Sequence, residues 1–190
     1  RGRGGYCGRW ARVARDRRAV TDVRNGRYKL GYGSTYGSRL EYHSQGFGMW
    51  SVELLGRLDV LDPNIIASVW SYDPSQSQGD ELDLEVSCFG DVLRKERALL
   101  SSYLPTLKQV LKAVDACDRH MVHLTVEPHV SRVRYDYWNG SEFVPYAFHE
   151  VKKTNQAGAN LRVGLSLKGA RVMYAQRPTI QITSVAFTAA

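Results

Sequence analysis

The segment Gly79-Asp80-Glu81-Leu82-Asp83-Leu84-Glu85-Val86 alternates between acidic and aliphatic side chains. A strand places successive side chains on opposite faces, so this alternation predicts a strand with three carboxylates on one face and three aliphatic groups on the other. Asp and Glu are poor strand formers, and nothing basic interrupts the acidic row. Two interpretations follow: a solvent-exposed strand face, or a site whose chemistry needs clustered carboxylates.

Short alternating runs continue on both sides of this segment. Alternation with a period of two predicts further strands over residues 47–54, 65–72, 121–126, 132–138, 161–167 and 179–187. Asn139-Gly140 is a turn signal and predicts a hairpin between residues 132–138 and 142–148. Many short strands without the spacing of β-α-β units predict an all-β sandwich or barrel.

Residues 92–118 fit this pattern poorly. Apolar side chains recur there at helical spacing, and Pro105 is suited to the first turn of a helix. The sequence leaves a short helix and a strand equally open over this stretch. The side chains at helical spacing are Leu104, Leu107, Val110, Leu111 and Val114.

The positive charge of the chain is confined to its first residues. The net charge is +7, and residues 1–27 alone contain nine Arg and two Asp, so the remainder is neutral. We therefore divide the chain into an Arg-rich segment, 1–24, and a domain, 25–190. Clustered Arg with Tyr6 and Trp10 is also compatible with a nucleic-acid-binding arm, so nucleic acid is a predicted partner only through residues 1–27. No apolar run approaches the roughly 18 residues that a membrane span requires.

Metal and cofactor sites have little support in the sequence. The three cysteines form no CxxC pair, and His120 and His123 are three apart on a predicted strand, which directs them to opposite faces. No Ser/His/Asp or Cys/His set has a recognisable signature. We predict no metal and no cofactor.

Paired carboxylates are the groups that glycoside hydrolysis requires. A retaining mechanism needs two carboxyl groups roughly 5–5.5 Å apart, one as nucleophile and one as acid/base. A third carboxyl between them can tune which one holds the proton, because close negative charges raise the pKa of their neighbours. Four strand residues span about 13 Å, so the outer side chains must lean inward to meet.

The acidic row resembles the catalytic signature of family 16 glycoside hydrolases. The resemblance extends over about residues 28–190 and includes the segments GFGMWSVEL (46–54), LDPNIIASVWSYD (61–73), EVSCFG (85–90) and HMVHLTVEPHVSRVRYDYWNG (120–140). It implies a concanavalin A-like jelly-roll sandwich of two antiparallel sheets with a sugar cleft on the concave sheet. It also implies a polysaccharide partner, no cofactor, and a secreted or periplasmic location.

On this resemblance the chain is a retaining glycoside hydrolase or transglycosylase acting on a β-linked polysaccharide. Glu81 matches the nucleophile, Asp83 the assisting carboxylate and Glu85 the acid/base. The substrate-binding candidates are Trp70, Tyr72, Ser51, Glu53 and Arg162.

The expected cleft differs from the clefts of family 16 glycoside hydrolases at several positions. They commonly carry Glu and Arg where this chain has Ser51 and Glu53, and Asn and Trp where it has Gly164 and Ser166. A site with its carboxylates but a reduced binding surface leaves two alternatives open. One is a non-catalytic carbohydrate-binding or structural module, and the other is a capsid-like jelly roll with a basic nucleic-acid-binding arm.

Overall fold

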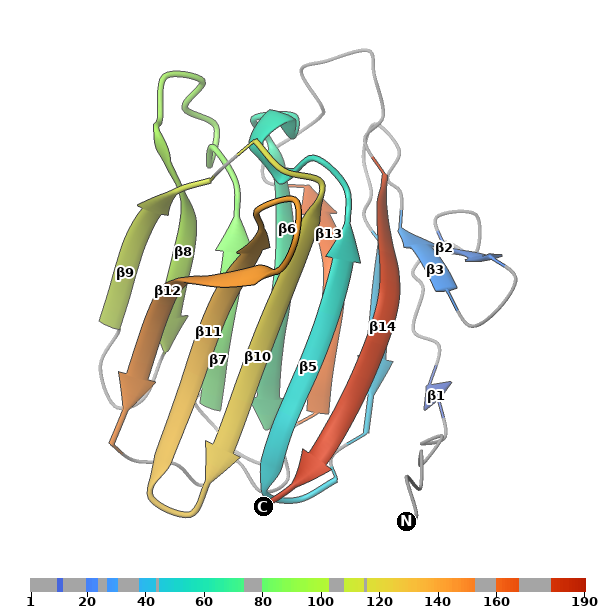
Figure 1. The fold of residues 1–190 in the computed structure, drawn as a ribbon, viewed down its shortest axis with the longest axis vertical. Helices are drawn as coiled ribbons and strands as arrows, with labels where there is room; N and C mark the ends of the chain where they lie inside the picture. Colours follow the sequence, from blue (N-terminus) through green and yellow to red (C-terminus); the bar gives the residue numbers. More distant parts are fainter. Residues whose placement is uncertain are drawn as a thin grey trace.

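The protein folds as two antiparallel seven-stranded sheets packed face to face (Figure 1). The computed structural model describes residues 10–11, 20–23, 27–30, 38–43, 45–73, 80–102, 108–114, 116–152, 160–167 and 179–190. Statements about the structure refer to these residues. Among them the only helical element is a 3-10 turn, η1, at Leu58–Val60.

The first sheet, sheet A, contains the acidic segment. Its strands run in the order β1 (Trp10–Ala11), β4 (Ser38–Tyr42), β13 (Asn160–Leu167), β6 (Ile65–Asp73), β7 (Asp80–Val86), β8 (Glu96–Ser102) and β9 (Lys108–Ala113). The acidic segment, β7, is therefore flanked on both sides.

The second sheet, sheet B, lies in front of sheet A in Figure 1. Its strands run in the order β12 (Phe143–Val151), β11 (Val130–Trp138), β10 (Arg119–Glu127), β5 (Gly48–Leu55), β14 (Ile180–Ala189), β3 (Arg27–Leu30) and β2 (Val20–Val23). Across the core, β7 packs against β11, β8 against β12, and β6 against β10.

The core consists of the inward-facing half of each alternating strand. Leu82 and Leu84 of β7 meet Val133 and Tyr135 of β11, all at most 1% exposed. Burial of apolar surface stabilises a fold by about 25 cal/mol per Å², so this layer is the main source of stability. It also fixes the face to which each polar residue of these strands points.

The strands predicted from alternation are confirmed, with shifts of one to three residues at their ends. The hairpin is also confirmed: Gly140 has a φ of 107°, and Asn139 Oδ1 accepts hydrogen bonds from the backbone N–H groups of Ser141 and Glu142. The two-sheet jelly roll is thus the fold of the protein.

The helical alternative over residues 92–118 is wrong for its described part, which forms β8 and β9. Val110 packs against the core while Leu111 is 44% exposed, so apolar residues occupy both faces of this strand. That distribution hides the period of two. Leu104, Pro105 and Leu107 lie outside the described residues.

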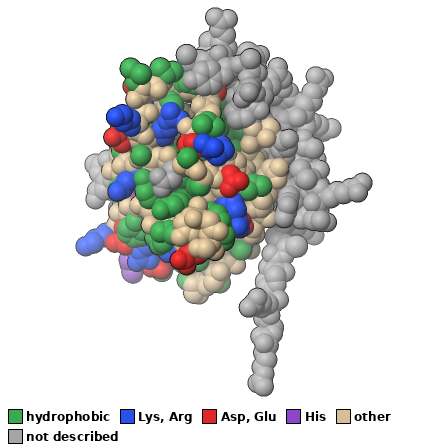
Figure 2. All heavy atoms as spheres, turned by 45° about the horizontal axis from the view of Figure 1, so that its top comes forward, with side chains coloured by type: hydrophobic (Ala, Val, Ile, Leu, Met, Phe, Trp, Pro, Cys, Tyr) green, Lys and Arg blue, Asp and Glu red, His purple; other side chains and the backbone are tan. Residues whose placement is uncertain are grey.

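The division of the chain at residue 24 stays a prediction. Two strands of the sheets, β1 and β2, lie before that boundary, and β2 pairs with β3. Figure 2 shows one face of the molecule, with the top of Figure 1 turned forward. Among the described residues on this face, basic and acidic side chains are interspersed, as expected of a neutral domain.

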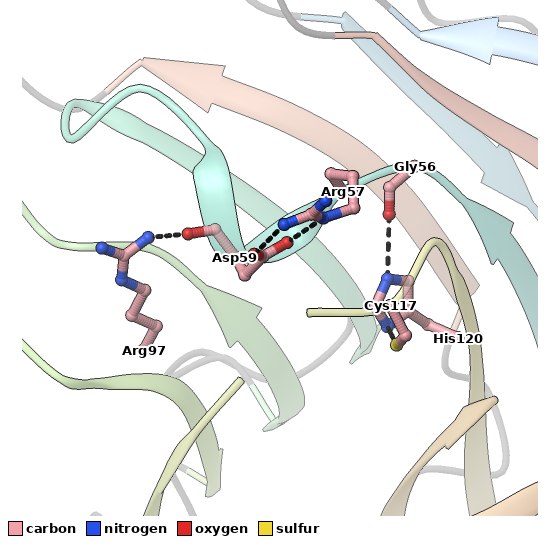
Figure 3. A network of polar contacts seen from close by, with 6 residues as sticks. All are labelled: Gly56, Arg57, Asp59, Arg97, Cys117 and His120. Atoms are coloured by element: carbon pink, nitrogen blue, oxygen red, sulfur yellow. Dashed lines mark hydrogen bonds and ion pairs between the residues drawn. The ribbon is translucent and has the colours of Figure 1, made fainter. Parts of the chain in front are cut away.

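A buried histidine connects the end of β5 to the start of β10. His120 is fully buried, and its Nε2 donates to the Gly56 carbonyl oxygen at 2.9 Å (Figure 3). Its Nδ1 lies 2.8 Å from the Tyr135 hydroxyl. Beside it, the Arg57 guanidinium binds the Asp59 carboxylate at 2.5 Å, and Arg97 of β8 donates to the Asp59 carbonyl oxygen. These contacts join sheet B to η1 and β8 at one end of the sandwich.

Burial lowers the pKa of His120, and this predicts a loss of stability in mild acid. As the pH falls through about 6.5, the unfolded chain binds a proton that the folded protein does not, so the free energy of unfolding decreases. His120→Gln should flatten this part of the curve, measured by urea unfolding between pH 5 and 8. His129→Gln, at an exposed turn position, is the control, and an unchanged slope in His120→Gln would contradict the assignment.

Candidate active site

The three carboxylates of β7 lie in one row on the face of sheet A that points away from the core. The alternate residues Leu82, Leu84 and Val86 are at most 1% exposed and fill the core, so Glu81, Asp83 and Glu85 must point the other way. Asp83 is only 5% exposed, and the two glutamates are partly buried. No register shift occurs along β7, so the row is regular.

The neighbouring strands supply side chains on the same face. Trp70 of β6 and Ser101 of β8 lie on either side of Asp83 in register. Ser68 and Leu99 lie on either side of Glu85. Cross-strand neighbours of this kind are within contact distance, so a polymer crossing the sheet at the carboxylates also meets Trp70.

The central carboxylate carries the strongest electrostatic perturbation. Burial raises the pKa of Asp83 well above its usual range, and the charges of Glu81 and Glu85 raise it further. A hydrogen bond from Ser101 Oγ to Asp83 Oδ2, 3.4 Å long, opposes these effects only weakly. Asp83 therefore holds a proton more readily than an ordinary aspartate and can share it with its neighbours.

A cation stands at the Glu81 end of the row. Burial raises the pKa of Glu81, and the positive charge of Arg162 opposes this rise only in part, so the pKa stays above its usual value. Arg162 lies on β13, next to Trp70 in register. At the other end, the register neighbours of Glu85 are Ser68 and Leu99.

Arg162 is fixed by a group that the sequence analysis did not identify. Its Nη2 donates to Glu41 Oε1 at 3.1 Å, and Asn160 Nδ2 donates to the same oxygen at 2.9 Å. Burial raises the pKa of Glu41, but these two hydrogen bonds outweigh burial and lower it overall. The ionised Glu41 thus holds the guanidinium in the face of sheet A.

Two of the expected substrate-binding residues lie on the same face of sheet A as the carboxylates. Trp70 and Arg162 lie on the same face as the carboxylates, in adjacent register positions. The backbone of Tyr72 pairs with Glu81, but the side chain of Tyr72 lies outside the described residues.

The expectation that Ser51 and Glu53 line the cleft is wrong. Both lie on β5, which belongs to sheet B, and Trp50, Val52 and Leu54 of this strand fill the core. Ser51 and Glu53 therefore point outward from the opposite sheet. The alternation gave their face relative to the core correctly, but it carries no information on which of the two sheets β5 joins.

The sequence did not predict four residues on the carboxylate face of sheet A, namely Glu41, Asn160, Ser101 and Leu99. Asn160 and Glu41 are 119 positions apart and meet only because β13 pairs with β4. Ser101 and Leu99 lie in the stretch whose period was ambiguous. Only the strand order could have identified all four.

Neither a metal centre nor a transmembrane helix is found within the described ranges. No group of three or more His, Cys, Asp or Glu side chains there could hold a metal ion. No helix there is long and apolar enough to cross a membrane.

Solved structures with this architecture include a β-glucanase, a pseudo β-1,3-glucanase and a transglycosylase. The β-glucanase of Bacillus licheniformis superposes with a TM-score of 0.66 at 14% identity, over 99% of this chain and 95% of that one. The fold is that of the family 16 glycoside hydrolases. Rv0315 of Mycobacterium tuberculosis, described as a pseudo β-1,3-glucanase, gives 0.67 at 14% identity, covering 93% of this chain and 80% of its own. The apo Crh5 transglycosylase gives 0.66 at 13% identity, with 98% and 81% covered.

These likenesses are of structure, not of sequence. No protein-family model matches the chain, and no curated protein matches it. At 13–14% identity, the family 16 fold is what these three likenesses establish.

Asp83→Asn should stabilise the protein at neutral pH. The unfolded chain releases the Asp83 proton near pH 3.9, while the folded protein retains it to higher pH, so the free energy of unfolding falls as the pH rises through this interval. A neutral amide removes this effect, and we expect a gain of about 0.5–2 kcal/mol, the usual range for relieving strain at a functional site. Urea unfolding at pH 7 measures it. Asp118→Asn, at an exposed aspartate, should change little, and destabilisation by Asp83→Asn would contradict the assignment.

Proposed function

We propose that the protein is a retaining glycoside hydrolase or transglycosylase that acts on a β-linked polysaccharide. The observation that carries this proposal is the regular row of Glu81, Asp83 and Glu85 on the outward face of sheet A. A partly buried row of three carboxylates destabilises a fold through desolvation and mutual repulsion, and perturbed groups of this kind cluster at functional sites. The most economical use is a reaction that needs one carboxylate and one carboxylic acid.

Glu81 is the proposed nucleophile because it matches the nucleophile position in the family 16 resemblance. Burial raises its pKa, and the positive charge of Arg162 opposes this rise in part. A Glu81 carboxylate oxygen attacks the anomeric carbon, and the bond from that carbon to the glycosidic oxygen breaks. Glu85 donates its proton to the departing oxygen. Glu85 then takes a proton from water, or from an acceptor hydroxyl, which attacks the glycosyl-enzyme and releases Glu81.

Asp83 is the proposed proton partner of both glutamates. Its raised pKa lets it hold a proton while a neighbouring glutamate is ionised, so the row loses repulsion without losing the nucleophile. The glutamate side chains must lean over Asp83 to reach the separation of roughly 5–5.5 Å that a retaining mechanism uses. Three rotatable bonds in each glutamate side chain allow this.

The substrate is proposed to cross sheet A over Trp70, which offers an aromatic face to the apolar face of a sugar ring. Arg162 and Asn160 lie on the same face on β13, with β6 between them and Glu81, and carry nitrogen donors. The structural similarity to a β-glucanase and a transglycosylase supports a β-glucan as the first substrate to test.

A non-catalytic glycan-binding module is the second candidate. One structural neighbour is described as a pseudo β-1,3-glucanase, so the fold is compatible with a lost activity. This candidate predicts saturable glycan binding without turnover. A nucleic-acid-binding role of residues 1–27 remains a separate prediction, since most of these residues lie outside the described ranges.

Glu81→Gln should abolish reducing-sugar release from β-1,3-, β-1,4- and mixed-linked glucans, because an amide cannot form the glycosyl-enzyme. Glu85→Gln should lower kcat by about 10²–10⁴-fold, the usual contribution of an acid/base group, and less on substrates with an activated leaving group. Both rates are measured on folded protein of each variant.

Glu142→Gln is the matched control, because Glu142 is exposed in the turn between β11 and β12. Its activity should equal that of the parent. Activity that survives Glu81→Gln, or a folded parent that releases no sugar from any glycan, would exclude the hydrolase and favour the binding module.

A further inference from the structure

The outward face of sheet B brings a serine, a histidine and an aspartate into one line. Ser51 of β5 and His123 of β10 are directly paired in register, and Ser51 Oγ lies 2.9 Å from His123 Nδ1. On the other side of the imidazole, His123 Nε2 lies 3.4 Å from Asp136 Oδ2 of β11. The three residues come from three adjacent strands, so the sheet itself fixes their spacing.

The hydrogen-bond roles along this line are determined by the aspartate. A carboxylate only accepts, so His123 Nε2 carries a proton and donates to Asp136, which leaves Nδ1 to accept from the Ser51 hydroxyl. The Asp136 side chain is only 3% exposed. Burial raises its pKa, but hydrogen bonds from His123 and Arg134 outweigh burial and lower it overall, so the carboxylate is ionised. This is the logic of a serine-nucleophile triad with the two ring nitrogens exchanged.

The serine is approachable from its other side. Ser51 is partly exposed, and its register neighbour on β14 is Ala186, an exposed residue whose side chain is one methyl group. Glu53, next along β5 on the same face, is held by Arg119 at 2.7 Å. The small side chain of Ala186 leaves this side of Ser51 unobstructed by a bulky register neighbour, which suits a short acyl group.

We propose that Ser51, His123 and Asp136 form a second active site, one that hydrolyses short-chain O-acyl esters such as acetyl esters. Ser51 Oγ bonds to the ester carbonyl carbon while His123 Nδ1 takes the hydroxyl proton and the carbonyl π electrons move to oxygen. The ester C–O bond then breaks, and His123 returns the proton to the departing alcohol oxygen. Water attacks the acyl-serine with His123 as base, which releases the carboxylic acid and restores Ser51.

Arg134 and Asp136 act through the imidazole of His123. Arg134 pairs with His123 in register, its Nη2 donates to Asp136 at 2.9 Å, and its side chain is 44% exposed. It lies on the far side of His123 from Ser51 and holds the Asp136 carboxylate in its ionised form. Asp136 does not touch the substrate and acts as a positioning residue for the imidazole.

The second site is independent of the proposed glycosidase. Its residues lie on the outside of sheet B, whereas Glu81 and Glu85 lie on the outside of sheet A, with the core between them. The ester chemistry can fail while glycan hydrolysis is observed, and the reverse is also true.

A fluorophosphonate probe tests the nucleophile directly on the full chain. The parent should be labelled on the peptide that contains Ser51 and should hydrolyse p-nitrophenyl acetate. Ser51→Ala should remove the label, and His123→Gln should slow labelling by about 100-fold, within the range for loss of a general base. Ser184→Ala changes an exposed serine on the same face of β14 and is the matched control, with unchanged labelling expected.

The role of Asp136 has a readout of its own. The ¹⁵N chemical shifts of the His123 ring should show the Nε2–H tautomer in the parent and lose that preference in Asp136→Asn. A folded parent that is not labelled at Ser51 would overturn the proposal. So would labelling that survives His123→Gln at the parental rate.

Discussion

The burial of Leu82, Leu84 and Val86 is the constraint on which the rest of the structure depends. Once these three side chains occupy the core, the pleat of β7 directs Glu81, Asp83 and Glu85 to the opposite face in one row. A slip of one residue would bury the carboxylates and expose the aliphatic groups, so the register of β7 between β6 and β8 is strongly specified. The mutual repulsion of the three carboxylates thus lies on the same strand as three fully buried core residues.

The sheet relieves this repulsion unevenly along the row. At one end Arg162, held by Glu41, opposes the rise in the pKa of Glu81 that burial causes. In the middle Asp83 tends to hold a proton, and at the other end Glu85 lies between Ser68 and Leu99. Environments that differ along a row of identical groups are what acid/base assignments require. The asymmetry comes from β13 and β4, whose residues reach the row through strand order alone.

Most of the fold could be predicted from the sequence because alternation is a local property. Leu161, Val163 and Leu165 mark one face of β13 without any knowledge of its neighbours. The edge strand β9 could not be predicted, since Leu111 is exposed while Val110 packs against the core. Strand order could not be predicted either. That is why Ser51 was assigned to the wrong sheet, and why its contact with His123, 72 positions away, was not foreseen.

The central claim is that Glu81 forms a covalent bond to a sugar, and trapping that bond tests it most directly. The parent would be incubated with activated 2-deoxy-2-fluoro-β-glycosides of glucose, cellobiose and laminaribiose and then digested for peptide mass mapping. The account predicts one added glycosyl unit on the peptide containing Glu81, absent from Glu81→Gln. A label on another residue, or no label on folded protein under conditions that label a known retaining β-glucanase, would contradict it.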